Sequence, residues 1–262
     1  MRLIFVLGKV YFDYISRYNS RDTAWWMLQA IQDYVNMVPS GLSILSEQIL
    51  RRFPADDQWI PWDDPRAYTD TSTLADIIQE ILQRHASGIT FREHNAGPDR
   101  HQEMKDNGFN FSIYADWKTG FIFGGNGDNC GTWMDKMGES VQARTKGLPA
   151  TPRDGAVVEI IGLVKSTVKW LDKLSAEGKF PYRGVVASGE CNDALLTHTV
   201  LDGLRCPTVD DKDTFVTYRC WNDQIQQSFE RCFHVPLGNS TQAECVVVLM
   251  QTLFRPVGRL QV

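Results

Sequence analysis

The chain has 262 residues, of which 43% are hydrophobic and 23% charged, a composition typical of a globular protein able to bury a full core. Its formal net charge of −5 excludes the basic field that polyphosphate binding requires, so no nucleic-acid partner is expected. No stretch approaches the roughly 18 apolar residues of a membrane span, and the short apolar run at the amino terminus lacks a signal-peptide cleavage site. We therefore expect a cytoplasmic protein that does not engage membranes.

The first predicted helix covers residues 22–35, where apolar residues recur at helical spacing. A shorter helical segment is predicted at 42–50. Thr73 and Asp76 form a capping-box pattern that starts another helix, and Gly88 ends it. We expect one side of this helix to be solvated: Asp76, Gln79, Glu80, Gln83 and Arg84.

Further along, residues 109–113 and 121–123 alternate and predict a small β-hairpin. The following loop, 124–131, is dense in glycine and asparagine and needs backbone conformations that other residues avoid. Residues 157–174 predict the strongest helix of the chain, and an apolar stripe over 221–233 predicts the last one. The pattern as a whole indicates a mainly α-helical fold whose loops carry the function.

The segment 129–140 is the most informative for chemistry, because its carboxylates surround an aromatic residue in a loop. A glycosidase needs a proton donor beside a sugar-stacking ring, and Asp135 next to Trp133 fits this role. The alternative interpretation is structural: Asp135 caps a helix, and Lys136 and Glu139 form a solvated ion pair.

A second candidate is the pair Arg21 and Asp22 at the start of the first predicted helix. An arginine that donates and an aspartate that accepts could together hold two adjacent sugar hydroxyls. Asp22 is also a plausible helix cap, and the two roles do not exclude each other.

A third candidate is the turn that leads into the central helix, with Arg153, Asp154 and Glu159 near the helix entry. A glutamate in so apolar a run needs a partner if it is buried, and Arg153 is the expected one. The alternative is an ordinary capped helix with an ion pair.

Six strings occur in a fixed order. They are Arg-Tyr-Asn-Ser-Arg-Asp at 17–22, Ile-Gln-Asp-Tyr at 31–34, Phe-Arg-Glu-His-Asn-Ala-Gly-Pro at 91–98, Met-Lys-Asp-Asn-Gly-Phe-Asn at 104–110, Asn-Cys-Gly-Thr-Trp-Met-Asp-Lys-Met-Gly-Glu-Ser at 129–140 and Ala-Thr-Pro-Arg-Asp-Gly at 150–155. Together they resemble the glucosidase domain of eukaryotic glycogen debranching enzymes. The resemblance implies an (α/α)6 toroid of the glucoamylase-like type. It also implies inverting hydrolysis, by two carboxylates, of the single α-1,6-linked glucose at a branch point of glycogen or another branched α-glucan.

By the same resemblance, Asp135 matches the general acid, and Arg21 and Asp22 match the pair that holds the non-reducing glucose. Closeness to these motifs extends the substrate-binding set to Trp133, Lys136, Glu139 and Arg153. The family's catalytic base lies in a Gly-Pro-Glu-Trp string, which does not occur in these 262 residues. The resemblance implies no metal, nucleotide or flavin cofactor. The six scattered cysteines, which form no Cys-x-x-Cys pair, are expected to be free thiols.

The resemblance covers residues 12–182 and resumes weakly at 221–235. We therefore expect an incomplete toroid, with a partial glucosidase domain over 1–182 and a poorly matching segment over 183–262 that holds a helix near 221–234. Negligible hydrolysis is expected without the base. Two alternatives remain: a catalytically inactive glucan-binding or regulatory fragment that self-associates through exposed apolar helix faces, and a helical scaffold unrelated to sugars.

Overall fold

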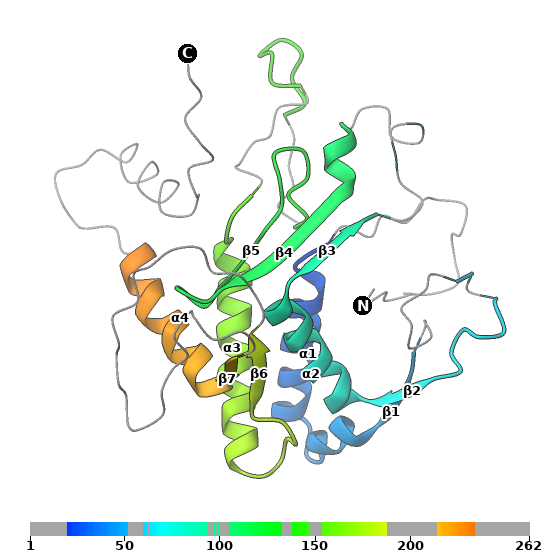
Figure 1. The fold of residues 1–262 in the computed structure, drawn as a ribbon, viewed down its shortest axis with the longest axis vertical. Helices are drawn as coiled ribbons and strands as arrows, with labels where there is room; N and C mark the ends of the chain where they lie inside the picture. Colours follow the sequence, from blue (N-terminus) through cyan, green and yellow to red (C-terminus); the bar gives the residue numbers. More distant parts are fainter. Residues whose placement is uncertain are drawn as a thin grey trace.

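The computed structural model describes residues 20–51, 60–61, 63–93, 97, 99, 105–132, 138–146, 154–187 and 214–233. This part of the chain is helix-rich with small antiparallel sheets (Figure 1). Its α-helices are α1 (Thr23–Met37), α2 (Leu74–Ser87), α3 (Val158–Ala176) and α4 (Tyr218–Phe233). Among the described residues no helix combines the length and the apolar character that crossing a bilayer would need.

The strands form three antiparallel sheets within the same residues. They are β1 (Gln48–Leu50) with β2 (Thr71–Thr73), β3 (Ile89–Arg92) with β4 (Asn110–Asp116) and β5 (Phe121–Gly124), and β6 (Gly184–Ala187) with β7 (Thr214–Thr217). Short 3-10 helices η1 (Gly41–Ser46) and η2 (Asp106–Phe109) precede β1 and β4. The predicted hairpin is therefore confirmed as β4 and β5, whereas the helix expected over 42–50 is a 3-10 turn followed by a strand.

Helix α2 begins and ends where its sequence predicts. The Thr73 hydroxyl accepts from the Asp76 amide at 3.1 Å, and the Asp76 carboxylate accepts from the Thr73 amide at 3.2 Å. The C-cap Gly88 has φ +85°, a conformation that side chains disfavour. The capping-box prediction is confirmed.

The solvated face predicted for α2 is wrong in part, because strand β6 and the residues before it lie against Asp76, Gln79 and Gln83. The Arg84 side chain stays 41% exposed. Gln83 donates to the Val186 carbonyl at 2.8 Å and accepts from the Val186 amide at 2.9 Å. Tyr182 donates to Asp76 at 2.6 Å, and Gln79 donates to the backbone of β6. A strand in a two-stranded sheet has an open edge whose backbone groups need partners, and the polar side chains of α2 supply them.

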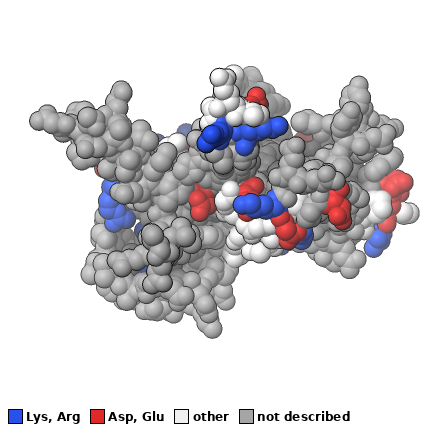
Figure 2. All heavy atoms as spheres, turned by 90° about the horizontal axis from the view of Figure 1, so that it is seen from above, with Lys and Arg blue, Asp and Glu red and all other residues white. Residues whose placement is uncertain are grey.

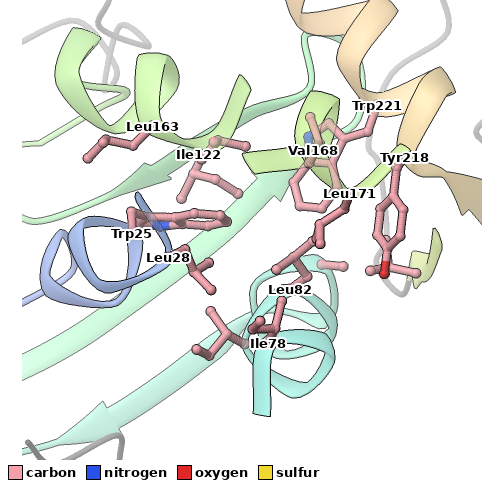
Figure 3. Packing of buried hydrophobic residues seen from close by; sticks show 14 of the residues in the cluster. Trp25, Leu28, Ile78, Leu82, Ile122, Leu163, Val168, Leu171, Tyr218 and Trp221 are labelled. Atoms are coloured by element: carbon pink, nitrogen blue, oxygen red, sulfur yellow. The ribbon is translucent and has the colours of Figure 1, made fainter. Parts of the chain in front are cut away.

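One hydrophobic core joins the helices to the three-stranded sheet. Helix α3 lies between α1 and α4 and contacts both (Figure 1). Trp25 of α1 is fully buried beside Ile122 of β5 and Leu163 of α3 (Figure 3). The apolar runs that predicted α1, α3 and α4 are therefore the surfaces that these helices bury against one another.

The carboxyl-terminal segments join the same core. Val185 of β6 and Val216 of β7 are almost completely buried, and Trp221 of α4 donates from its indole nitrogen to the Gly120 carbonyl at 2.8 Å. Strands β6 and β7 had no clear sequence signal. The division of the chain at residue 182 stays a prediction, although the described residues on its two sides share one hydrophobic cluster.

The cysteines depart in part from the expectation of free thiols. Cys130 and Cys232 are free, but Cys220 is disulfide-bonded. The expectation is therefore wrong for Cys220.

Candidate functional site

The Arg21 side chain lies at the centre of the candidate site and is only 1% exposed. Its Nε donates to the Cys130 carbonyl at 2.8 Å, and its Nη1 donates to the Gly155 carbonyl at 2.7 Å. Its backbone amide donates to the Gly131 carbonyl at 2.7 Å. The start of α1 is thereby tied to the glycine-rich loop and to the turn before α3, and we call this set of contacts the arginine cradle.

Two glycines make room for the cradle. A Cβ at Gly124 would lie 3.2 Å from Cδ of Arg21 and 2.9 Å from the Ser112 carbonyl oxygen. Gly155 has φ +99°, and its backbone exchanges hydrogen bonds with Gly124 at 2.9 and 3.2 Å. A side chain at Gly124 would displace the arginine, and one at Gly155 would be strained, so both positions favour glycine for a physical reason.

Asparagine side chains shape the loop between β5 and the cradle. The Asn126 side-chain oxygen accepts from the Asn129 amide at 2.9 Å. Asn129 is 1% exposed, donates to the Gly108 carbonyl at 2.7 Å and accepts from the Gly131 amide at 3.1 Å. Asparagine side chains can form hydrogen bonds with neighbouring backbone groups in this way. These bonds stabilise an irregular loop that lacks the regular backbone hydrogen bonds of a helix or sheet.

Asp22 lies beside the cradle and is 3% exposed. It occupies the N-cap position of α1, yet its side chain makes no capping hydrogen bond. The carboxylate accepts from the Ser20 hydroxyl, and the same hydroxyl accepts from the Thr23 amide at 3.2 Å. The side-chain cap suggested for Asp22 is therefore wrong, because Ser20 bonds the helix amide in its place.

Burial is the main electrostatic influence on Arg21, because desolvation lowers the pKa of its guanidinium. Contact with Cys130 and the negative charges of Glu159 and Asp22 act in the opposite direction. Glu159 was expected to pair with Arg153, which lies outside the described residues, as does that pairing. Within the described part of the chain, its negative charge acts on Arg21.

Three polar atoms near this point are buried without a hydrogen-bond partner in the described structure. They are Nη2 of Arg21, Oε1 of Glu159 and Nε1 of Trp25. Trp25 is in the first turn of α1, four residues after Arg21, and Glu159 is in the first turn of α3, four residues after Gly155. Buried polar groups are normally satisfied, so these three need an explanation.

The structure describes only some of the predicted site residues. It places Arg21 against Cys130 and Gly131, with Asp22 next to it in the chain, and it shows Glu139 exposed on the segment 138–146. The other candidates lie outside the described residues: Asp135, Trp133, Lys136 and Arg153. Sequence reasoning gave no role to Asn129, Gly124 or Gly155, although the unusual density of glycine and asparagine over 124–131 was a signal that could have identified the first two.

The described residues hold no metal cluster, and side chains of one charge sign do not gather on the face shown in Figure 2. No group of three His, Cys, Asp or Glu side chains among them could hold a metal ion. On the face shown in Figure 2, the described acidic and basic side chains lie among one another.

The chain is similar in sequence to known proteins of one family. The family model described as amylo-alpha-1,6-glucosidase matches residues 10–253. The glycogen debranching enzyme of Saccharomyces cerevisiae is 48% identical over 228 residues, which cover 87% of this chain and 13% of the yeast protein. The chain thus spans about an eighth of the length of that curated relative, and the match includes every segment of the arginine cradle. The chain belongs to the amylo-alpha-1,6-glucosidase family.

Proposed function

We propose that this chain is part of an α-1,6-glucosidase that hydrolyses the single α-1,6-linked glucose at branch points of glycogen or a related branched α-glucan in the cytoplasm. Membership of the amylo-alpha-1,6-glucosidase family and the likeness to a yeast glycogen debranching enzyme support this function. The alternative of a glucan-binding fragment without catalysis is not favoured, because the family is one of hydrolases.

The observation that carries the proposal is the contact between two strings far apart in the chain. The Arg21 amide and guanidinium bond the carbonyls of Gly131 and Cys130. The proposed glucose-holding pair and the loop that leads to the proposed acid therefore lie side by side. Asp135 follows Thr132 by three residues, which span at most about 10 Å, so covalent geometry alone keeps it near the cradle.

In this proposal Asp135 is the general acid that protonates the glycosidic oxygen as the bond breaks. Asp22 accepts a hydrogen bond from a hydroxyl of the terminal glucose, and Arg21 holds the loop and donates to the sugar. Trp133 stacks on a sugar ring, and Lys136, Glu139 and Arg153 bind further hydroxyls. Inversion also requires a base across the ring, and we propose that helices α1 to α4 are part of an (α/α)6 toroid that brings both carboxylates to one site.

Binding of isomaltose, two glucoses joined by an α-1,6 bond, tests the substrate part of this proposal. We expect titration calorimetry of the 262-residue chain to detect isomaltose binding that Asp22→Asn weakens by about 10-fold or more, because a charge-assisted hydrogen bond is lost. Asp33→Asn is the matched control, since Asp33 is exposed on the same helix and accepts only from Gln29 in the described structure. Equal affinity of all three proteins would refute the role of Asp22, and no binding at all would refute the proposed substrate.

The acid can be tested separately with a singly branched α-1,6-glucosyl dextrin. We expect negligible glucose release by the chain in buffer, and release of β-glucosyl azide when azide supplies the nucleophile that an absent base would otherwise activate. Asp135→Asn should abolish this azide-dependent product. Asp128→Asn, which removes a surface partner of Lys105 in the same loop, should retain it. Azide rescue that survives Asp135→Asn would exclude Asp135 as the proton donor.

Self-association is a further part of the proposal, because α1 exposes large apolar side chains. Trp26 and Tyr34 are each 46% exposed and Met37 is 81% exposed. Exposed apolar patches of this kind favour association. Size-exclusion chromatography should show oligomers, and a monomer at high protein concentration would argue against association through this face.

A further inference from the structure

A buried donor just before α1 and a buried acceptor in the first turn of α3 are close enough for their charges to interact. Arg21, two residues before α1, donates to the carbonyl of Gly155, and Glu159 follows that glycine by four residues. Nη2 of Arg21 and Oε1 of Glu159 are both buried and lack a hydrogen-bond partner in the described structure. Two hydrogen bonds, from Nε and Nη1, already hold the guanidinium, so it cannot turn to satisfy Nη2 without breaking them.

The chemistry of the two unpartnered atoms limits what could satisfy them. An anion would meet the carboxylates of Glu159 and Asp22, and a cation would meet the guanidinium. An apolar group would leave both atoms desolvated and unpaired, which is costly in a buried site. A hydroxyl accepts one hydrogen bond and donates another, so it matches one free N–H and one free carboxylate oxygen.

We propose that Nη2 of Arg21 and Oε1 of Glu159 together bind one hydroxyl of the terminal glucose, which makes Glu159 a specificity-determining residue of the site. This inference rests on the proposed function and adds a residue that neither the sequence motifs nor the resemblance assigned to the sugar. The glutamate is held by the first turn of α3, and Leu163, one turn further on, anchors that helix beside Trp25 in the core.

Electrostatics agree with this placement. The negative charge of Glu159 raises the pKa of Arg21 against the opposing effect of burial, so the two groups interact through the protein interior. A hydroxyl between them would receive a charge-assisted bond from one group and give one to the other, and such bonds are the stronger kind.

The site should therefore select a terminal glucose that keeps the hydroxyl bound by these two groups. A site with fixed, buried hydrogen-bonding groups rejects a ligand that lacks the matching hydroxyl, because those groups are then left unpaired. We expect one monodeoxy analogue of methyl α-isomaltoside, altered in its non-reducing ring, to bind the wild-type chain at least about 10-fold more weakly than the parent compound.

The experiment titrates methyl α-isomaltoside and its monodeoxy analogues into four proteins: wild type, Glu159→Met, Glu159→Gln and Glu230→Met. Glu159→Met removes the acceptor at similar volume, so the parent compound and the critical deoxy analogue should bind it equally. Glu159→Gln retains a neutral acceptor and should keep part of the selectivity. Glu230 is exposed on α4 and accepts from Gln226, so Glu230→Met should keep all of it.

The outcomes separate this inference from the function on which it rests. If the wild type did not bind methyl α-isomaltoside, both the proposed function and this inference would be refuted. Binding of the parent compound without discrimination among the deoxy analogues would overturn the role of Glu159 and leave the function standing. Selectivity that persists in Glu159→Met, with a circular dichroism spectrum and melting temperature like those of the wild type, would also overturn it. The wild-type series can overturn the role of Glu159 even if Glu159→Met fails to fold, and the milder Glu159→Gln then shows whether the selectivity depends on this residue.

Discussion

His85 of α2 provides a test of how burial controls stability in this fold. Its side chain lies in the core, its Nδ1 is 2.7 Å from the Ile81 carbonyl oxygen, and its ring centre is 4.7 Å from that of Trp25. Desolvation lowers the pKa of His85 from 6.5 to about 4, although the hydrogen bond with the Ile81 carbonyl acts in the opposite direction. The folded protein therefore keeps this imidazole neutral at a pH where an unfolded chain would protonate it.

The sign follows from proton uptake. Between pH 6.5 and about 4 the unfolded chain binds a proton at this position that the folded chain does not, so stability falls as the pH is lowered. The contribution is complete above pH 6.5 and is lost at pH values below about 4. The whole loss amounts to about 3 kcal/mol of unfolding free energy.

Urea unfolding followed by circular dichroism, at pH values from 7.5 down to 4, measures this loss. We expect His85→Gln to remove about 3 kcal/mol of the pH dependence, because glutamine can bond the Ile81 carbonyl but cannot take up a proton. Ser87→His, which adds an exposed histidine to the same helix, should change the pH dependence by less than about 1 kcal/mol. Identical pH profiles for the wild type and His85→Gln, or a His85 pKa near 6.5 by NMR titration, would refute the reasoning.

Three further predictions concern stability and can be measured by denaturant unfolding. Thr73→Ala should cost about 1 kcal/mol, because the capping box of α2 loses its hydroxyl; an unchanged midpoint would argue against this cap. Gly120→Ala should cost about 1 to 2 kcal/mol or more, since φ is +73° and the new Cβ would lie 3.0 Å from Cγ1 of Ile225. Tyr182→Phe should cost about 1 kcal/mol at neutral pH and raise the pKa of Asp76 towards its usual value, because the hydrogen bond from Tyr182 is the main cause of its lowered pKa. Ionised Asp76 stabilises the fold above its unfolded pKa, so the variant should lose less stability than the wild type on acidification, as NMR and unfolding at pH 7 and pH 3 would show.

The contacts of the arginine cradle illustrate what could not be predicted from the sequence. The strings around Arg21, Cys130 and Gly155 were each recognisable, but the bonds that join them connect residues 109 and 134 positions apart. Nothing in the local pattern indicates that a guanidinium spans these two carbonyls. The predicted pairing of Glu159 with Arg153 lies outside the described residues and stays a prediction, whereas the charge interaction of Glu159 with Arg21 had no signal in the local pattern.

Local signals did determine much of the helical framework. Helices α1, α2, α3 and α4 begin and end close to where apolar periodicity, the Thr73 capping box and Gly88 predict, since those signals depend on residues within a turn or two of one another. The tertiary structure alone decided that β6 lies against the polar side of α2, that the Ser20 hydroxyl rather than the Asp22 carboxylate bonds the Thr23 amide, and that the charge of Glu159 acts on Arg21. Each of these depends on backbone and side-chain groups brought together by burial of the core, and their partners cannot be identified from spacing along the chain.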